Sequence, residues 1–298
     1  MRAEGAEVRG VDVNARVEGI VAGDISRPGE WQVGARGCDL FVHTAAIVSL
    51  RSGLQDFHRV NVLGTRNALD SARDAGIERF LSLSSVTVFG NDFPDGVDER
   101  HPVRLLGVPY VDTKIAGEQV VLQAHAAGEV AATILRPGDF YGPGSRPWLI
   151  TPLQELRRGR LVLPAGGRAI HSPIYISDLI DGMLAAAAPG CSGEVLTISG
   201  GVGVTTREYF GRIAAMAGGR PVRAAPTPVL LALTGAIAAL ERLLGSPGEV
   251  NPNSIRYLTR TGTYSIEKAR RLIGFEPRVD LDLGMNDCER WLRESGLL

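Results

Sequence analysis

The sequence predicts an α/β protein built on a doubly wound parallel sheet, and two observations support this fold class. Short apolar runs typical of buried strands occupy residues 6–13, 38–46, 79–89 and 131–138, and helix-like stretches such as 60–76 lie between several of them. Strands separated by helical crossovers form a parallel sheet that is covered on both faces. With 298 residues, 44% of them hydrophobic, the chain can also bury a large core. Ligands of such a fold are expected at the carboxyl ends of the strands.

The composition excludes several classes of function. The formal charge is -1, with acids and bases mixed along the chain, so no overall field is available to hold nucleic acid or an anionic membrane nonspecifically. The cysteines, Cys38, Cys191 and Cys288, are odd in number and far apart, which is typical of reduced thiols. The histidines lack metal-ligand spacing, and neither a signal peptide nor a transmembrane segment is expected. We therefore expect a cytoplasmic protein without a metal centre.

The first strand ends at an acid, Asp12. In dinucleotide-binding proteins such an acid accepts hydrogen bonds from the ribose hydroxyls of an adenosine. No arginine follows immediately to bind a 2′-phosphate, which favours NAD over NADP, although Arg16 nearby weakens this preference. Taken by itself, Asp12 fits an acid that stabilises a turn equally well.

Two further strand ends carry residues suited to the same ligand. Asp24 and Ile25 follow a strand-like run, where the carboxylate could meet an adenine amino group and the aliphatic chain could flank the ring. The next strand ends in small residues, Thr44, Ala45 and Ala46, which would let a pyrophosphate or a ribose approach the backbone closely. Neither feature is decisive alone, because small residues at a strand end also serve tight packing.

The strongest cluster joins a serine at the end of a strand to a tyrosine and a lysine four residues apart. Ser85 lies in "SLSSVTVFG", and Tyr110 and Lys114 lie in "PYVDTK". On a helix, positions i and i+4 share a face, so the Lys114 ammonium would lie near the Tyr110 phenol and lower its pKa. Tyr110 could then exchange a proton with a substrate hydroxyl while hydride passes to or from a nicotinamide, and Ser85 could hold the reacting oxygen. Lys114 would also bind the nicotinamide ribose. The competing interpretation is a surface lysine beside a half-buried tyrosine.

In order and spacing, these segments resemble the extended short-chain dehydrogenase/reductase superfamily. The matching pieces are "VDV", "AGDI", "VHTAA", "NVLGTRNAL", "SLSSVTVFG", "YVDTK" and "LRPGDFYGPG", and later pieces such as "YSIEKARRLIGFEPRVDLDLGM" extend the resemblance over nearly the whole chain. In character the chain is most similar to the 3β-hydroxysteroid dehydrogenase-like branch. The resemblance implies a Rossmann-like fold, an NAD-dependent enzyme of the epimerase/dehydratase type, and a homodimer packed through the helix that bears Tyr110.

The resemblance also assigns roles to single residues. The catalytic positions are those of Ser85, Tyr110 and Lys114, with Thr87 as a neighbouring hydroxyl. Pro137 and Gly138 follow the strand that flanks the nicotinamide in the superfamily. The full set of cofactor positions is matched by Asp12, Asp24, Ile25, Thr44, Ala45, Ala46, Asn61, Tyr110, Lys114, Pro137 and Gly138.

The glycine fingerprint of the superfamily and the strand before it do not occur in the sequence. That strand normally lies in the middle of the sheet, between the strand ending at Asp12 and the one ending near Thr44. We expect either that the native protein begins upstream of Met1, which is the alternative we favour, or that the chain is a truncated relative with impaired NAD binding. The segment "SGGVGVTT" at 199–206 is interpreted as a glycine turn before a helix cap, not as a substitute.

The chain is expected to divide near Trp148. Residues 1–147 would form an N-terminally truncated dinucleotide-binding domain, and residues 148–298 a smaller substrate-binding lobe whose segment at about 170–200 returns to the main sheet. The apolar run Pro228–Leu240 is interpreted as a helix against the body of the protein. Packing into a plain core is favoured for this helix over covering a nonpolar substrate.

Three hypotheses follow for the function. The favoured one is an NAD-dependent oxidoreductase that oxidises a secondary alcohol of a nonpolar, steroid-like small molecule. Sugar-nucleotide epimerases of the superfamily place an arginine where this chain has His171, with Arg168 three residues earlier, so a charged sugar nucleotide is less favoured. The second hypothesis is a nucleotide-sugar epimerase or dehydratase that oxidises its substrate transiently, and the third is a catalytically impaired binding or regulatory relative.

Overall fold

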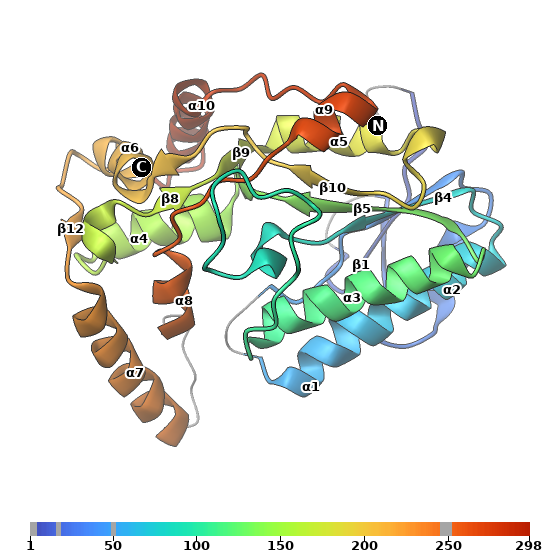
Figure 1. Ribbon diagram of the computed structural model, residues 1–298, viewed down its shortest axis with the longest axis horizontal. Helices are drawn as coiled ribbons and strands as arrows, with labels where there is room; N and C mark the ends of the chain where they lie inside the picture. The colour runs from blue at the N-terminus through green and yellow to red at the C-terminus, as the bar shows by residue number, and fades with distance from the viewer. Residues whose placement is uncertain (1–4, 16–18, 49–51, 245–251) are drawn as a thin grey trace.

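The computed structural model of the protein describes residues 5–15, 19–48, 52–244 and 252–298 (Figure 1). Its central sheet is parallel throughout, and its strand order is β10-β5-β4-β3. The four strands are β3 (Leu40–His43), β4 (Arg79–Leu83), β5 (Ala131–Pro137) and β10 (Val195–Ile198). The parallel α/β sheet that the sequence predicts is therefore present, and β10 is the strand that joins it from the later part of the chain.

Helices cover both faces of this sheet (Figure 1). One face carries the helical segments between β3 and β5, which are α1 (Leu54–Phe57), η3 (His58–Leu63), α2 (Gly64–Asp74), η4 (Val86–Phe89) and α3 (Pro109–Ala126). The opposite face carries α5 (Ile176–Ala186), η7 (Pro189–Cys191) and α9 (Glu267–Ile273).

Successive residues of a strand point to opposite faces of the sheet. In β4, Phe80 shares an apolar cluster with Leu69 of α2, whereas Leu81 shares one with Leu179 of α5. This two-sided burial explains the continuous apolar runs in the sequence.

The N-terminal segment departs from a single continuous sheet. The strands β1 (Gly10–Asp12) and β2 (Ile20–Ala22) pair in parallel only with each other, and the short helix η2 (Glu30–Ala35) follows them. Among the described residues no strand joins β1 to β3, so β3 forms an edge of the four-stranded sheet. The separation lies between the strand that ends at Asp12 and the one that ends near Thr44, which is where the strand missing from this sequence lies in the superfamily.

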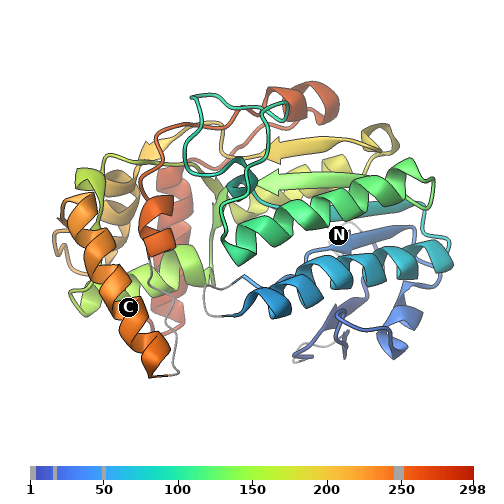
Figure 2. The same ribbon diagram turned by 60° about the horizontal axis from the view of Figure 1, so that its bottom comes forward.

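Short strands and helices build the C-terminal half (Figure 2). Three two-stranded sheets pair β6 (Asp139–Tyr141) with β9 (Pro173–Tyr175), β7 (Val162–Leu163) with β12 (Arg223–Ala224), and β8 (Ile170–His171) with β11 (Val204–Thr205). The helices around them are η5 (Arg146–Ile150), α4 (Thr151–Arg157), η6 (Ala165–Gly167), α6 (Thr206–Met216) and α10 (Leu281–Glu294). Leu153, Tyr209 and Leu292 form part of their common core. The division of the chain at residue 147 stays a prediction.

The segment at 199–206 is a turn before a helix, as predicted. Thr205 precedes α6, and its side chain accepts a hydrogen bond from the backbone N–H of Glu208. Such a cap satisfies an amide that the first turn of a helix leaves without a partner.

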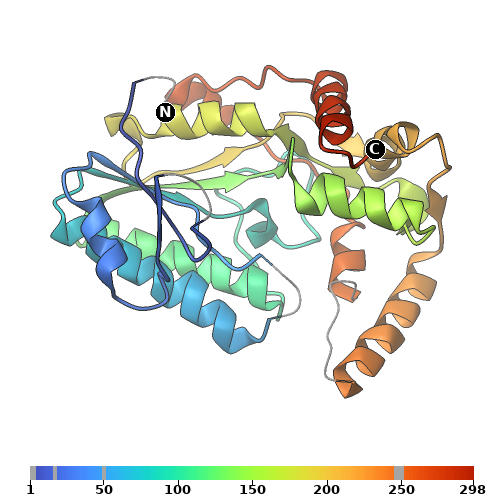
Figure 3. The ribbon, with the colours of Figure 1, turned by 180° about the vertical axis from the view of Figure 1, so that it is seen from behind.

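The apolar run at 228–240 forms the helix that the sequence predicts, α7 (Thr227–Leu243), and α8 (Pro252–Tyr257) lies beside it. The expectation that this helix packs into a plain core is wrong. Only Leu230 and Thr234 are buried among the described side chains of α7. The helix extends away from the rest of the molecule (Figures 1 and 3). No helix within the described ranges is both long and apolar enough to cross a bilayer.

Candidate active site at the carboxyl end of β4

Ser85 follows β4 and starts the short helix η4. Its Oγ accepts hydrogen bonds from the backbone N–H of Thr87 at 3.2 Å and from the Thr87 hydroxyl at 3.0 Å. A hydroxyl that already accepts two hydrogen bonds still has its own proton to donate. The Ser85 hydroxyl also acts on the phenol of Tyr110 and favours its ionised form, as a hydrogen-bond donor does. Thr87 therefore orients Ser85 as a donor toward Tyr110.

Tyr110 and Lys114 lie on the first turns of α3, which begins at Pro109. Proline suits the first position of a helix, because its fixed φ is helical and the missing N–H would have no partner there. The Lys114 ammonium donates a hydrogen bond to the backbone carbonyl of Leu83 at 2.9 Å. Leu83 is the last residue of β4. Both side chains therefore reach the carboxyl end of the same strand, and the predicted convergence of Ser85, Tyr110 and Lys114 is present.

The acidities of the two α3 side chains follow mainly from burial. Burial raises the pKa of Tyr110 above 10.0, and the hydrogen bond with Ser85 offsets only part of this shift. The predicted lowering of the Tyr110 pKa by Lys114 is therefore wrong for this structure. Burial also lowers the pKa of Lys114 to about 8, while the Glu118 carboxylate acts in the opposite direction. Lys114 stays largely protonated at neutral pH, but a moderate rise in pH removes its charge.

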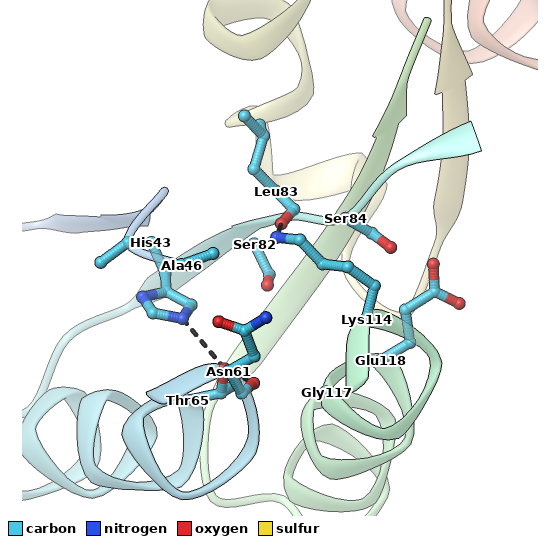
Figure 4. Close-up of a pocket in the computed structure, with 11 residues that line it drawn as sticks. His43, Ala46, Asn61, Thr65, Ser82, Leu83, Ser84, Lys114, Gly117 and Glu118 are labelled. Atoms are coloured by element: carbon cyan, nitrogen blue, oxygen red, sulfur yellow. Dashed lines mark hydrogen bonds between the residues drawn. The ribbon is translucent and has the colours of Figure 1, made fainter. Parts of the chain in front are cut away.

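A cavity lies between the ends of β3 and β4 and the helices η3, α2 and α3 (Figure 4). Its volume is about 10 Å³, which is room for about one water molecule. Its wall is formed by His43, Ala45, Ala46, Asn61, Thr65, Ser82, Leu83, Ser84, Lys114, Gly117 and Glu118. Lys114 points across this cavity toward the end of β4 (Figure 4). Three predicted cofactor residues besides Lys114, namely Ala45, Ala46 and Asn61, therefore share one site with it.

Asn61 holds the cavity together by connecting two of its walls. Its side-chain oxygen accepts a hydrogen bond from the backbone N–H of Ile47 at 2.8 Å, and its amide donates to the Thr113 hydroxyl at 3.1 Å. Ile47 lies in the loop after β3, and Thr113 lies on α3 beside Lys114. Asn61 therefore fixes the distance between the end of β3 and the helix that bears the tyrosine and the lysine. The sequence indicated Asn61 only through the resemblance of "NVLGTRNAL" to the superfamily, and its connecting role depends on contacts that the sequence does not show.

His43 belongs to this site, although no motif in the sequence had indicated it. It is the last residue of β3, is buried, and lies with Nε2 3.0 Å from the Thr65 hydroxyl (Figure 4). Burial, helped by the charge of Lys114, lowers the His43 pKa to about 3. The imidazole is therefore neutral at physiological pH and adds no second positive charge beside Lys114.

The acids Asp12 and Asp24 make turns in this structure. The Asp12 side chain accepts from the backbone N–H of Asn14 at 2.7 Å, and Asp24 accepts from that of Ser26 at 2.9 Å. Hydrogen bonds from Ser26 hold the pKa of Asp24 below its usual value. Neither acid lines the cavity, because both lie on the separate β1–β2 unit. The alternative interpretation of Asp12 as a turn acid accounts for its contacts here.

The other predicted cofactor residues lie around the cavity but do not line it. Thr44 is exposed at the end of β3, and Ile25 contacts the start of α2 at Gly64. Pro137 and Gly138 are buried at the end of β5. A Cβ on Gly138 would lie 2.8 Å from the carbonyl oxygen of Ser172, so only glycine lets the two backbones approach this closely.

The residues that do line the cavity fit the nicotinamide-ribose half of a dinucleotide. Ala45 and Ala46 place only methyl groups at the end of β3, and the Lys114 ammonium can donate to sugar hydroxyls. A glycine loop between a first strand and a helix, which binds the pyrophosphate in Rossmann folds, does not occur in the part of the chain that the structure describes. Asp12 and Asp24 lie on β1–β2, where the adenosine half binds in such folds.

Next to this site, the buried carboxylate of Asp139 connects β6 to the C-terminal segment. Asp139 accepts hydrogen bonds from Arg260 at 2.9 Å and from the Tyr257 hydroxyl, and it lies 3.1 Å from Nδ1 of His171. The charge of Arg260, more than that of His171, outweighs burial and lowers the pKa of Asp139 well below its usual range. His171 itself is fully buried, with its ring centroid 4.2 Å from that of Tyr209. His171 therefore belongs to the core and does not face an open substrate site.

Comparison with known proteins places this geometry in a family. The family described as "NAD dependent epimerase/dehydratase family" matches residues 1–199. The chain is 30% identical over 303 residues to a 4-hydroxy-2-methyl-3-oxo-4-farnesyl-3,4-dihydroquinoline-1-oxide ketoreductase of Stigmatella aurantiaca, covering 98% of this chain and 88% of that protein. It is 27% identical to a 3-beta-hydroxysteroid dehydrogenase of Mycolicibacterium neoaurum, covering 90% of this chain and 78% of that protein.

Solved structures agree with these sequence matches. MoeE5 in complex with UDP-glucuronic acid and NAD is similar with a TM-score of 0.78 at 25% identity, covering 99% of this chain and 93% of that chain. The dTDP-glucose 4,6-dehydratase DesIV of Streptomyces venezuelae, with NAD and TYD bound, is similar with a TM-score of 0.73 at 25% identity, covering 95% of this chain and 81% of that chain. Sequence, fold and site geometry together show that the chain belongs to the NAD-dependent epimerase/dehydratase family, within the extended short-chain dehydrogenase/reductase superfamily.

Proposed function

We propose that the protein uses NAD to oxidise a secondary alcohol of a nonpolar small molecule, with Tyr110 as the group that exchanges a proton with the substrate oxygen. The observation that carries this proposal is the group of side chains at the end of β4. Thr87 donates to Ser85, Ser85 favours the ionised form of the Tyr110 phenol, and Lys114 lies one helical turn further along α3 and donates to the last carbonyl of β4. We call Ser85, Tyr110 and Lys114 the active-site trio.

Each member of the trio has a separate task in this mechanism. Ser85 donates a hydrogen bond to the reacting oxygen and keeps it beside the phenol of Tyr110. In its ionised form Tyr110 accepts the proton of the alcohol during oxidation, and in its protonated form, which its raised pKa favours, it donates that proton to the carbonyl oxygen during reduction. Lys114 supplies a positive charge and hydrogen bonds for the nicotinamide ribose. Bound NAD would supply the nicotinamide that accepts hydride from the carbinol carbon.

The choice of substrate rests on two kinds of support. The relatives from Stigmatella aurantiaca and Mycolicibacterium neoaurum are named for a farnesyl-bearing ketone and for a hydroxysteroid, both largely apolar molecules. The position at which sugar-nucleotide epimerases of the superfamily carry an arginine is occupied by His171, which is buried against Tyr209.

We also propose NAD in preference to NADP, because Asp12 at the end of β1 suits a ribose with free hydroxyls. We further propose that the protein is a cytoplasmic homodimer whose two subunits pack through α3.

A second candidate function is the transient oxidation of a nucleotide sugar. It is favoured by the similarity to a dTDP-glucose 4,6-dehydratase of Streptomyces griseus, which is 27% identical over 261 residues. A third candidate, a binding relative without turnover, is favoured by the separation of β1 and β2 from the four-stranded sheet.

A substrate assay separates these candidates. With NAD and a panel of steroid and isoprenoid secondary alcohols, we expect net formation of NADH and of the matching ketones. UDP- or dTDP-sugars serve as the matched panel under the same conditions. Conversion of these sugars without net NADH would support the second candidate instead, and absence of turnover with both panels, together with NAD binding by calorimetry, would support the third.

The pH dependence of ketone reduction provides a further prediction. Tyr110 has a raised pKa and stays protonated at neutral and mildly alkaline pH, so it can donate its proton throughout this range. Lys114 loses its charge as the pH rises through about 8. We therefore expect kcat/KM for NADH-dependent reduction to be constant near neutrality and to fall as the pH passes about 8. Lys114→Met should lower kcat/KM and remove this fall, so a variant with an unchanged profile would refute the role of Lys114.

A further inference from the structure

The helix α7 exposes an apolar surface to solvent. Val229, Leu233, Ile237, Leu240 and Leu243 follow one another at spacings of three and four residues and therefore share one side of the helix. All five are exposed, from 39% for Ile237 to 85% for Leu243. The other exposed positions of α7 with described side chains are alanines and a proline. We call this surface the α7 stripe.

The burial of α7 is the reverse of that of an ordinary surface helix, which hides its apolar side and exposes its polar side. Its buried side includes a hydroxyl, Thr234, which donates to the carbonyl oxygen of Leu230 at 2.7 Å. The neighbouring helix α8 packs on α7 but leaves the stripe uncovered. Continuous exposed apolar surface of this kind marks an interaction site.

A group of arginines lies where α7 begins. The segments 155–163 and 218–227 together contain five arginines and one acid, Glu155. These segments lie side by side, because β12 pairs with β7 and Arg220 donates to the carbonyl of Arg157 at 3.1 Å. Thr227, the first residue of α7, accepts from the N–H of Ala165, just beyond β7. The arginine cluster, all of it exposed, is formed by Arg157, Arg158, Arg160, Arg220 and Arg223.

We propose that the α7 stripe and the arginine cluster dock the protein on the surface of an anionic phospholipid bilayer. The stripe would enter the boundary between headgroups and acyl chains, and the arginines would contact lipid phosphates. The whole chain has a formal charge of -1, which predicts no attraction to such a surface, but folding concentrates positive charge at the start of the helix that carries the stripe. A second copy of the chain fits this surface less well than a bilayer. Its own arginine cluster carries the same positive charge and would repel this one.

Docking would serve the proposed function, on which this part of the inference rests. Apolar alcohols partition into bilayers, so an enzyme on the membrane surface meets them at a higher local concentration. α8, which packs on α7, ends at Tyr257, whose hydroxyl bonds to Asp139. Asp139 directly follows Gly138 at the end of β5. One continuous set of contacts therefore leads from α7, on the side opposite the stripe, to the edge of the candidate active site.

Vesicle flotation tests this proposal with the full chain. We expect the protein to float with vesicles made of equal parts phosphatidylcholine and phosphatidylglycerol, to bind phosphatidylcholine vesicles more weakly, and to be released by high salt. The double variant Leu233→Glu/Ile237→Glu should bind roughly tenfold or more weakly, because its charges would have to enter the apolar boundary. Arg160→Glu/Arg223→Glu should lose the preference for the anionic vesicles.

The matched control is Leu283→Glu, which places the same charge on an exposed leucine of α10, outside the stripe. It should bind vesicles like the unmodified chain, and circular dichroism should show that all variants are folded. Absence of binding to either vesicle type would refute the proposal, as would equal losses in the stripe variant and the Leu283→Glu control. A dimer in sedimentation that the stripe variant dissociates, with no vesicle binding, would assign the stripe to a second copy.

Flotation needs neither NAD nor substrate, so its outcome is independent of the catalytic proposal. Vesicle binding by a chain without dehydrogenase activity would refute the proposed function and leave the docking surface intact. Activity toward a short, water-soluble alcohol should be the same in the stripe variant and the unmodified chain, because no residue of the stripe lines the candidate active site.

Discussion

The Tyr110→Phe variant is expected to bind NAD nearly as tightly as the unmodified protein and to lose about 10²–10⁴-fold in kcat. The substitution removes only the hydroxyl that bonds to Ser85 and keeps the ring that packs at the start of α3. Without that hydroxyl, no group of the trio can take the proton of the alcohol. Stopped-flow formation of NADH and calorimetric titration with NAD measure the two quantities separately.

Tyr209→Phe is the matched control for this experiment. It also removes one buried phenolic hydroxyl, which donates to the carbonyl of Trp148 at 2.9 Å, but it lies in the C-terminal core. We expect a small loss of stability and near-normal kcat for this variant. Equal effects of the two substitutions on kcat would show that Tyr110 acts through the fold and not through proton transfer.

The Glu118→Gln variant is expected to lower the free energy of unfolding by about 3–5 kcal/mol, because it leaves the buried charge of Arg136 without its partner. Glu118 of α3 and Arg136 of β5 form two parallel hydrogen bonds of 2.9 and 2.7 Å, and their side chains are only 2% and 6% exposed. For a chain of this size the loss corresponds to a fall of about 6–10 °C in Tm by differential scanning fluorimetry.

Two further variants test the origin of this loss. Asp98→Asn removes one partner of an exposed ion pair with Arg100 and should change Tm by little. Glu118→Leu/Arg136→Met removes both buried charges and should recover most of the stability, because no unpaired charge remains. If the double variant is as unstable as Glu118→Gln, the packing of α3 on β5, and not the ion pair, sets the stability at this site.

The catalytic part of the site could be predicted because its geometry is local. Tyr110 and Lys114 are one helical turn apart, so the sequence spacing alone brings them to the same side of α3. Ser85 could be placed with them because ligands of a parallel sheet bind at the carboxyl ends of strands. The parallel direction of the strands from β3 to β10 followed from the alternation of strands and helices.

What the sequence could not show depends on contacts between distant segments and on burial. The Tyr110 pKa was predicted to fall because a lysine is near in sequence, whereas the depth of burial decides its direction. Asp139 and Arg260 are 121 residues apart, and nothing in the chain between them indicates that they pair. The spacing of apolar residues in α7 predicts a helix whether its apolar side is buried or exposed. The spacing alone therefore could not show that this side faces solvent.

The measurement that tests the central claim most directly is the fate of a deuterium placed on the carbinol carbon of an apolar secondary alcohol. If the trio performs the proposed oxidation, the deuterium will appear in the NADH that is released, and Tyr110→Phe will slow its transfer without changing its destination. Recovery of the deuterium in an isomerised or dehydrated product, with no labelled NADH released, would contradict the account.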